Sequence, residues 1–187
     1  TDQRWKVSDH LQKDASDTAI KKVSSPQVLH IATHGFFLKD VKDSAGKVYG
    51  IESGIAKQNP LLRSGVILAG AAAMAKERFV SVEKEDGILT AYEAAGLDLT
   101  GTDLVVLSAC ETGLGEMLNG QGVYGLQRAF FVAGARSLIM SLWKVDDAAT
   151  QQLMTNFYTN WLKSGNKQTA FKQAQLQLMT KYKDPFY

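Results

Sequence analysis

The chain has 187 residues, of which 45% are hydrophobic and 21% are charged, and its formal net charge is +2. This composition is ordinary for a soluble globular domain, and the charge is too small to argue for a nucleic acid or a membrane surface as a partner. Residues 1–20 lack the apolar core of a signal peptide, and no apolar run approaches the roughly 20 residues of a membrane span. The single cysteine, Cys110, excludes an internal disulfide and fits a reducing compartment, so we expect a cytoplasmic protein.

The first predicted element is a short helix. Residues 1–10 are polar and form an unassigned N-terminal segment. Residues 11–23 place apolar side chains among charged ones, which predicts a helix capped by Asp14 or Ser16. Pro26 ends this region, because the residue before a proline disfavours the helical conformation.

A buried strand over Val28–Ala32 follows, and it ends at Thr33 and His34 just before Gly35. His30 would share a strand face with His34 and lie about 13 Å behind it. We interpret His30 as a core histidine with a hydrogen-bonded ring, since histidine rings inside proteins need a partner. His34, at the mouth of the strand, is the candidate functional residue.

The middle of the chain alternates between loops and short elements. Residues 36–58 are predicted to be a loop, with a short hairpin around residues 44–46 as one option. The run Ser64–Ala69 predicts a third buried strand, and Gly87–Ala95 predicts a helix entered through Thr90.

The apolar run Leu104–Leu107 predicts a strand buried on both faces. It leads through Ser108 to Cys110 and into a glycine-rich loop. Ser108, like Thr33 on the earlier strand, is interpreted as a packing residue. Cys110 by itself is readily explained as a small buried residue, but a His and a Cys at two strand ends are also how nucleophilic cysteine sites are built.

The C-terminal part predicts four more elements. A helix spans residues 120–132, a strand spans 136–143, and helices span about 147–163 and 167–182. Together with the earlier strands, this order predicts an α/β fold with a mostly parallel sheet and helices on both faces. The glycines near Cys110 lack the lysine of a phosphate-binding loop and the spacing of a dinucleotide fingerprint, and a lone cysteine does not make a zinc site. We therefore expect no metal and no other cofactor.

The stretches HIATHG and LVVLSACETGLGE closely resemble the CHAT family, caspase-like cysteine peptidases often found C-terminal to tetratricopeptide repeats. Further blocks resemble the family in the family's order: Asn59–Gly65, Asp86–Ala91, Gly120–Gly134 and Ser141–Asp147. The resemblance covers residues 11–187, which we take as one CHAT domain. The family usually adds another strand after an aromatic pair such as Phe186 and Tyr187, so we expect the domain to lack its last strand.

The resemblance implies a caspase-like fold and a cysteine endopeptidase that hydrolyses peptide bonds in protein substrates. It places His34 and Cys110 as the catalytic dyad. The backbone N–H groups of Gly35 and Cys110 are candidate donors to the oxyanion. The alternative is a regulated or catalytically silent caspase-like module that serves interaction or scaffolding. In either case we expect an N-terminal repeat region or an activating partner outside this chain.

Asp146 and Asp147 follow the strand that ends at Trp143. Their simplest role is to cap the next helix, for which Asp is well suited. The alternative is that one carboxylate receives a basic side chain at the P1 position of a substrate. Both interpretations remain open at the level of sequence.

Overall fold

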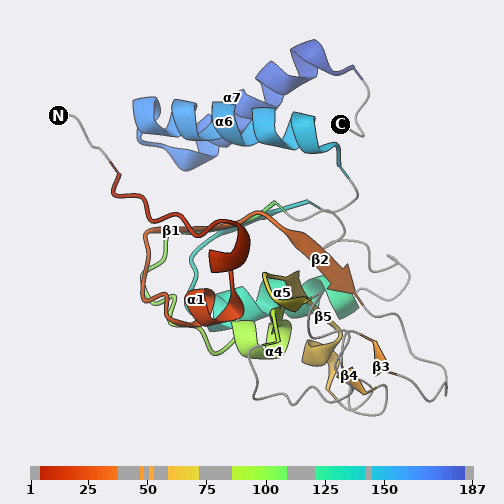
Figure 1. Cartoon of the computed structure of the whole chain (residues 1–187). Coiled ribbons are helices and arrows are strands. Elements are labelled where there is room, and N and C mark those ends of the chain that lie inside the picture. The colour runs from red at the N-terminus through yellow and green to blue at the C-terminus, as the bar shows by residue number, and fades with distance from the viewer. Residues whose placement is uncertain are drawn as a thin grey trace. The chain divides into compact units, whose positions relative to one another are not determined.

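A computed structural model describes residues 5–37, 47–48, 51–52, 59–71, 86–108, 121–141 and 145–183 (Figure 1). The chain divides into two compact units. The larger unit is Asp9–Trp143, and the smaller one combines Thr1–Ser8 with Lys144–Tyr187. Among the described helices, none is long and apolar enough to cross a membrane.

The larger unit contains two three-stranded sheets and a short hairpin. The first sheet is parallel, in the order β1-β7-β8, and consists of β1 (Val28–Ile31), β7 (Leu104–Leu107) and β8 (Leu138–Met140). The second is antiparallel, in the order β2-β5-β6, and consists of β2 (His34–Phe37), β5 (Ser64–Ile67) and β6 (Ile88–Thr90). The hairpin pairs β3 (Lys47–Val48) with β4 (Ile51–Glu52). It lies beyond the predicted turn at residues 44–46, which is outside the described residues.

The predicted α/β class is confirmed. The predicted mostly parallel sheet is found only in part, because one of the two three-stranded sheets is parallel and the other is antiparallel. The predicted third buried strand is β5, and it runs antiparallel to β2 and β6. The predicted helix at Gly87–Ala95 begins as strand β6, and only Ala91–Ala94 forms helix α4. Apolar runs this short do not distinguish a parallel from an antiparallel partner, nor a strand from a buried helical turn.

Several helices begin directly after a residue whose side chain caps the helix N-terminus. The N-terminal helix is a 3₁₀ turn, η1 (Gln12–Asp14), followed by α1 (Asp17–Lys21), whose N-cap is Ser16. The Thr90 side chain caps α4 in a reciprocal capping box with Glu93. A second 3₁₀ turn, η2 (Pro60–Leu62), precedes β5, and α5 (Gln121–Val132) agrees with its prediction.

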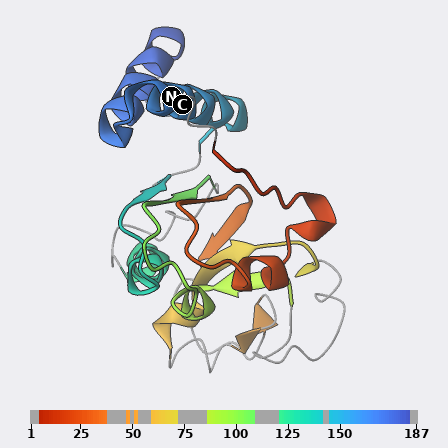
Figure 2. The ribbon, with the colours of Figure 1, turned by 90° about the vertical axis from the view of Figure 1, so that its left-hand side faces the viewer.

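One face of the parallel sheet packs against α5. Leu29 and Ile31 of β1, Val105 and Leu107 of β7, and Leu138 and Met140 of β8 join Leu126 and Phe130 of α5 in a single core. Residues of α4 and β5 extend the same core, and α4 lies beside α5 (Figure 2). All residues of β7 are buried, as a strand covered on both faces requires.

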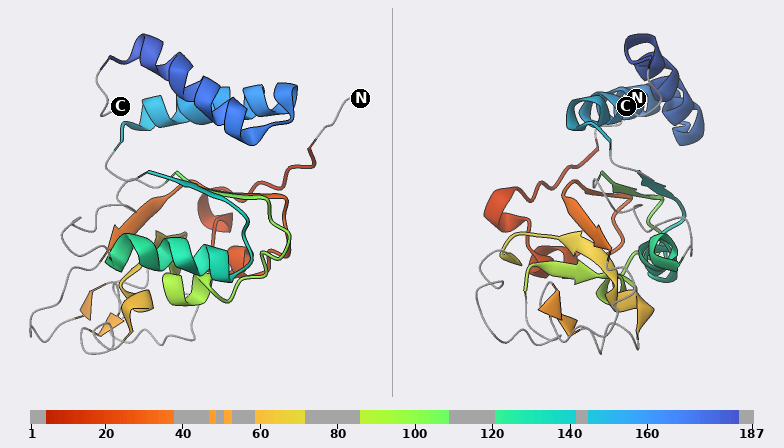
Figure 3. Two further views of the ribbon diagram at one scale, coloured as in Figure 1. Left: turned by 180° about the vertical axis from the view of Figure 1, so that it is seen from behind. Right: turned by 90° about the vertical axis from the view of Figure 1, so that its right-hand side faces the viewer.

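The smaller unit is a helical hairpin closed by aromatic side chains. Its helices are α6 (Asp147–Ser164) and α7 (Lys167–Lys181), which run side by side (Figure 3). Gly165 ends α6 in the left-handed conformation, with φ of 68°. Trp5 packs edge-on against Trp161, with ring centroids 4.9 Å apart, so the N-terminal segment contributes to this unit.

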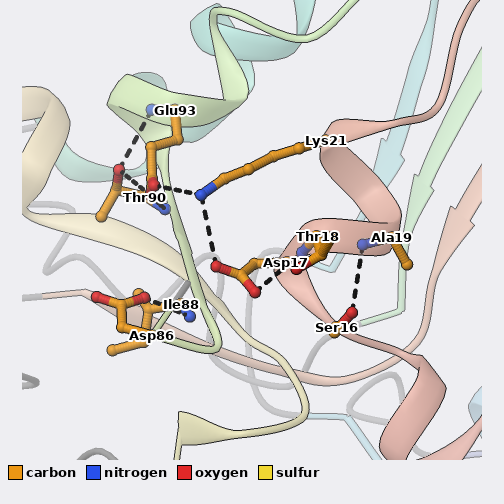
Figure 4. Close-up of polar contacts among 9 residues, drawn as sticks. All are labelled: Ser16, Asp17, Thr18, Ala19, Lys21, Asp86, Ile88, Thr90 and Glu93. Atoms are coloured by element: carbon orange, nitrogen blue, oxygen red, sulfur yellow. Dashed lines mark hydrogen bonds and ion pairs between the residues drawn. The ribbon is translucent and has the colours of Figure 1, made fainter. Parts of the chain in front are cut away.

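A charged network joins α1 to α4 (Figure 4). Lys21 Nζ lies 2.9 Å from Glu93 Oε1 and 3.4 Å from Asp17 Oδ2, and Asp17 is almost fully buried. Asp86 lies nearby, and its Oδ1 accepts a hydrogen bond from the N–H of Ile88 at 2.9 Å. Burial, followed by the negative charges of Glu93 and Asp17, raises the pKa of Asp86.

Gly65 lies where the Phe36 side chain and the neighbouring strand leave no room for a Cβ atom. Phe36 lies opposite Gly65, and a Cβ on Gly65 would come within 2.8 Å of the Phe36 ring and 2.5 Å of the Leu89 carbonyl oxygen. Gly65→Ala should therefore lower the free energy of unfolding by about 1–3 kcal/mol, as measured by urea denaturation. Gly96→Ala is the control, because its Cβ would approach Glu93 O only to 3.4 Å. An equal loss of unfolding free energy in the two variants would contradict this steric explanation.

The raised pKa of Asp86 has a defined consequence for stability. A carboxyl group whose pKa is higher in the folded state destabilises that state once it ionises. Asp86→Asn should unfold at a higher urea concentration than the parent at pH 7, and the difference should vanish below about pH 4.

Asp98→Asn provides a comparison of opposite sign. A hydrogen bond from the Ser24 hydroxyl, followed by one from the N–H of Thr100, lowers the pKa of Asp98. The ionised carboxylate of Asp98 therefore stabilises the folded state above its unfolded pKa, and Asn should lower stability at pH 7. The same sign for both variants would contradict these assignments.

Candidate active site

Two adjacent parallel strands lead toward the predicted dyad. β1 pairs with β7 so that Ile31 lies opposite Leu107, and the N–H of Ser108 donates to the Ile31 carbonyl at 3.0 Å. His34 comes three residues after Ile31, and Cys110 comes three residues after Leu107. Cys110, together with the glycine-rich loop that follows it, lies outside the described residues. The structure therefore gives the position of His34 and of the strand that leads to Cys110.

His34 is the first residue of β2 and is exposed. The chain leaves the parallel sheet at Ala32 and Thr33 and joins β5, where His34 lies opposite Ile67. The Thr33 hydroxyl donates a hydrogen bond to the Ile67 carbonyl and thus connects the chain to β5 at this point. The expectation that His30 and His34 share one continuous strand is therefore wrong, because the two residues belong to strands in different sheets.

Gly35, the first candidate oxyanion donor, is buried in β2 opposite Val66. The pairing of β2 with β5 places Gly35 in this buried position. The oxyanion roles of Gly35 and Cys110 remain predictions, since they depend on where the N–H groups point relative to a bound substrate.

His30 makes a contact that the sequence analysis missed. Its Nε2 lies 2.8 Å from Ser108 Oγ, a hydrogen-bond distance. The predicted hydrogen-bonded ring is confirmed, but the residue keeps exposed surface and is not a core histidine. Desolvation by the surrounding protein atoms lowers the pKa of His30, which favours the neutral imidazole. Ser108 is thus more than a packing residue, and the signal for this pair was two polar residues at the ends of otherwise apolar strands.

Asp146 is the N-cap of α6. Its Oδ1 accepts a hydrogen bond from the N–H of Ala149 at 2.8 Å, and its backbone carbonyl accepts from the hydroxyl of Thr150. Asp147 is the exposed first residue of the helix. The capping role is confirmed for Asp146. Both aspartates belong to the smaller unit and His34 to the larger one, so a role in receiving a basic P1 side chain remains a prediction.

The described residues do not suggest a metal centre. In the part of the chain that the structure describes, no group of three or more His, Cys, Asp or Glu side chains is arranged to hold a metal ion. What the strands bring to one edge is instead a set of proton-exchanging and hydrogen-bonding groups. His34, Ser108 and His30 all lie at or near the carboxyl ends of β1 and β7, where the chemistry of α/β sheets usually occurs.

A comparison with protein-family models matches residues 4–187 to the family described as CHAT domain. The match begins a few residues before the boundary at residue 11 expected from the sequence motifs. No curated protein and no solved structure matches the chain. The resemblance inferred from the two strand-end motifs is confirmed by the family match.

The capping role of Asp146 can be separated from its charge. Asn caps helices as well as Asp does, whereas Ala cannot accept the hydrogen bond from Ala149. Asp146→Ala should lower the free energy of unfolding by about 1 kcal/mol, while Asp146→Asn should have little effect, as measured by thermal or urea denaturation. Asp147→Ala is the neighbouring control. A loss of stability in the Asn variant equal to that in the Ala variant would show that charge, not capping, is the main contribution.

Proposed function

Because the chain belongs to the CHAT domain family, which is caspase-like, we propose that it is a cysteine endopeptidase acting on peptide bonds in protein substrates. The observation that carries the proposal is the register of β1 and β7. His34 and Cys110 each follow, by three residues, one member of the Ile31 and Leu107 pair. Parallel neighbours lie about 4.8 Å apart, and three residues of chain reach at most about 11 Å. Chain connectivity therefore limits how far apart the two residues can lie, which supports their pairing as a dyad.

The chemistry follows from the two side chains. The thiolate of Cys110 is the nucleophile, and His34 accepts the thiol proton. The sulfur attacks the scissile carbonyl carbon, and the resulting oxyanion accepts hydrogen bonds from the N–H groups of Gly35 and Cys110. When the C–N bond breaks, the leaving amine takes a proton from His34. Water, deprotonated by His34, then hydrolyses the thioester and regenerates the thiol.

The exposure of His34 supports this role. An exposed imidazole can reach a substrate and exchange protons with water between the two half-reactions. The Thr33 hydrogen bond to Ile67 and the pairing of β2 with β5 hold the backbone of His34. The backbone is thus fixed while the ring remains accessible, as a general base requires.

We also propose how the site selects its substrates and how its activity is controlled. A carboxylate of Asp146 or Asp147 would favour Arg or Lys at P1, with Arg gaining more through bidentate geometry. A repeat region N-terminal to this domain, or an activating partner, would control access of protein substrates to the dyad.

Substitution of the dyad tests the proposed activity. Cys110→Ala and His34→Ala should each lower kcat/KM for cleavage by at least about a thousandfold, while the thermal unfolding midpoint stays near that of the parent. The substrates are matched peptides with Arg, Lys, Leu, Met or Asp at P1, and kcat/KM is measured by chromatography of the products. His10→Ala, an exposed histidine outside the proposed site, is the control.

Full turnover in either dyad variant would reject the dyad. Absence of cleavage in the parent, with Cys110 reacting like an ordinary thiol, would favour the scaffolding alternative. A preference for Leu or Met that Asp146→Asn and Asp147→Asn leave unchanged would remove the aspartates from the P1 site.

A further inference from the structure

A hydrogen-bonded polar pair lies at the carboxyl end of the strand that leads to Cys110. His30 of β1 lies opposite Val106 of β7, so Ser108 is two residues further along the neighbouring strand. Residues two apart on a strand share a face, and the His30 side chain therefore reaches Ser108 diagonally across the sheet. The atoms in contact are His30 Nε2 and Ser108 Oγ, at 2.8 Å.

Ser108 is held at two points. Its backbone N–H donates to the Ile31 carbonyl at 3.0 Å, which continues the parallel ladder, and its hydroxyl bonds to His30. The backbone bond fixes how far the strand extends, and the side-chain bond fixes which way Ser108 faces. Cys110 is only two residues further on, within about 7 Å of chain.

The protonation state of His30 suits this contact. Desolvation lowers the pKa of His30, so the ring is neutral near pH 7. A neutral imidazole has one donor and one acceptor nitrogen, and a serine hydroxyl can complement either. The pair therefore needs no charge, and it adds no second ionised group next to the proposed thiolate.

We propose that His30 and Ser108 are positioning residues of the cysteine site, and that their hydrogen bond aligns the end of β7 so that the Cys110 thiol meets His34. This inference rests on the proposed function. Neither residue touches substrate or gives up a proton in the reaction. Their contribution is geometric, since a displacement of about 1 Å in a reacting group can cost on the order of a hundredfold in rate.

The same sheet offers a matched control at its opposite end. The Ser137 hydroxyl donates to the Asp103 carbonyl just before β7 and thus connects the residues that precede β8 and β7. Ser137→Ala and Ser108→Ala each remove one hydroxyl that bonds between neighbouring strands. Only Ser108 lies at the end of the sheet where the dyad is proposed.

The test combines two measurements on the whole chain. The first is kcat and KM for peptide cleavage. The second is the pH dependence of alkylation by iodoacetamide, which reports on Cys110 alone because it is the only cysteine. A thiol paired with His34 should be alkylated at pH values well below the ordinary thiol pKa of about 8.5.

The variants are Ser108→Ala, Ser108→Thr, His30→Phe and the double variant Ser108→Ala/His30→Phe. Ser108→Ala is the sharper single change, because His30 makes a further interaction besides this hydrogen bond. Ser108→Thr keeps the hydroxyl and serves as the conservative rescue.

Ser108→Ala and His30→Phe should lower kcat by about 10- to 100-fold with little change in KM. Their alkylation profiles should move toward that of an ordinary thiol, while Ser108→Thr stays near the parent. The double variant should lose no more than the worse single variant, because both substitutions remove the same contact. Ser137→Ala should lower the unfolding midpoint and leave kcat unchanged.

Parent-like kcat and alkylation in folded Ser108→Ala and His30→Phe, alongside a large effect of His34→Ala, would overturn the positioning role and leave the dyad intact. An equal loss of kcat in Ser137→Ala would also overturn it, because the effect would then be one of general stability. If the parent neither cleaves peptides nor shows an alkylation profile sensitive to His34→Ala, the proposed function fails and the inference fails with it.

Discussion

The parallel pairing of β1 with β7 is the constraint on which the candidate site depends. It places Ile31 opposite Leu107, and it is held from one side by the core that both strands share with α5. A slip of β1 by one residue against β7 would turn Leu29 and Ile31 out of that core, which the buried apolar surface strongly opposes. The hydrophobic core, although it takes no part in any reaction, thus sets the position from which both halves of the proposed dyad extend.

Strands β1 and β2 are almost consecutive in the chain but belong to two different sheets. After Ile31 only Ala32 and Thr33 separate β1 from β2, and the Thr33 hydroxyl connects this crossing to β5. The antiparallel sheet is fixed in turn by the close approach of Phe36 to Gly65, and by α4, which begins where β6 ends. Because Lys21 bridges Glu93 of α4 to the buried Asp17 of α1, loss of the lysine would leave a buried carboxylate without its cation. Charge and packing therefore act together to hold the strand that carries His34.

Two polar residues, His30 and Ser108, lie within or directly after the apolar strands of the parallel sheet. β1 is apolar except for His30, and β7 is wholly apolar and is followed directly by Ser108. His30 and Ser108 bond to each other instead of filling the core. A pair of apolar residues would have been compatible with the same strands. Departures from local rules of this kind concentrate at functional sites, where orientation matters more than burial. The helical hairpin shows the opposite case, in which Asp146 has a sufficient structural explanation as a helix cap.

Features that depend on neighbouring residues could be predicted from the amino-acid sequence. These features include the α/β class, the family, the strands around His30 and Leu104–Leu107, and the entry to α4 at Thr90. Ser16 and Asp146 were each one of the options for a helix cap, and the structure shows both as caps. Other features became apparent only in the folded chain: the antiparallel partners of β5, the break between His30 and His34, the contact of His30 with Ser108, and the packing of Trp5 on Trp161. The physical reason is that capping and periodicity are local energies, written within a few adjacent residues. Strand partners and long-range contacts are chosen by the burial and hydrogen bonding of segments far apart in the chain, so a short apolar run is compatible with several partners until the whole core assembles.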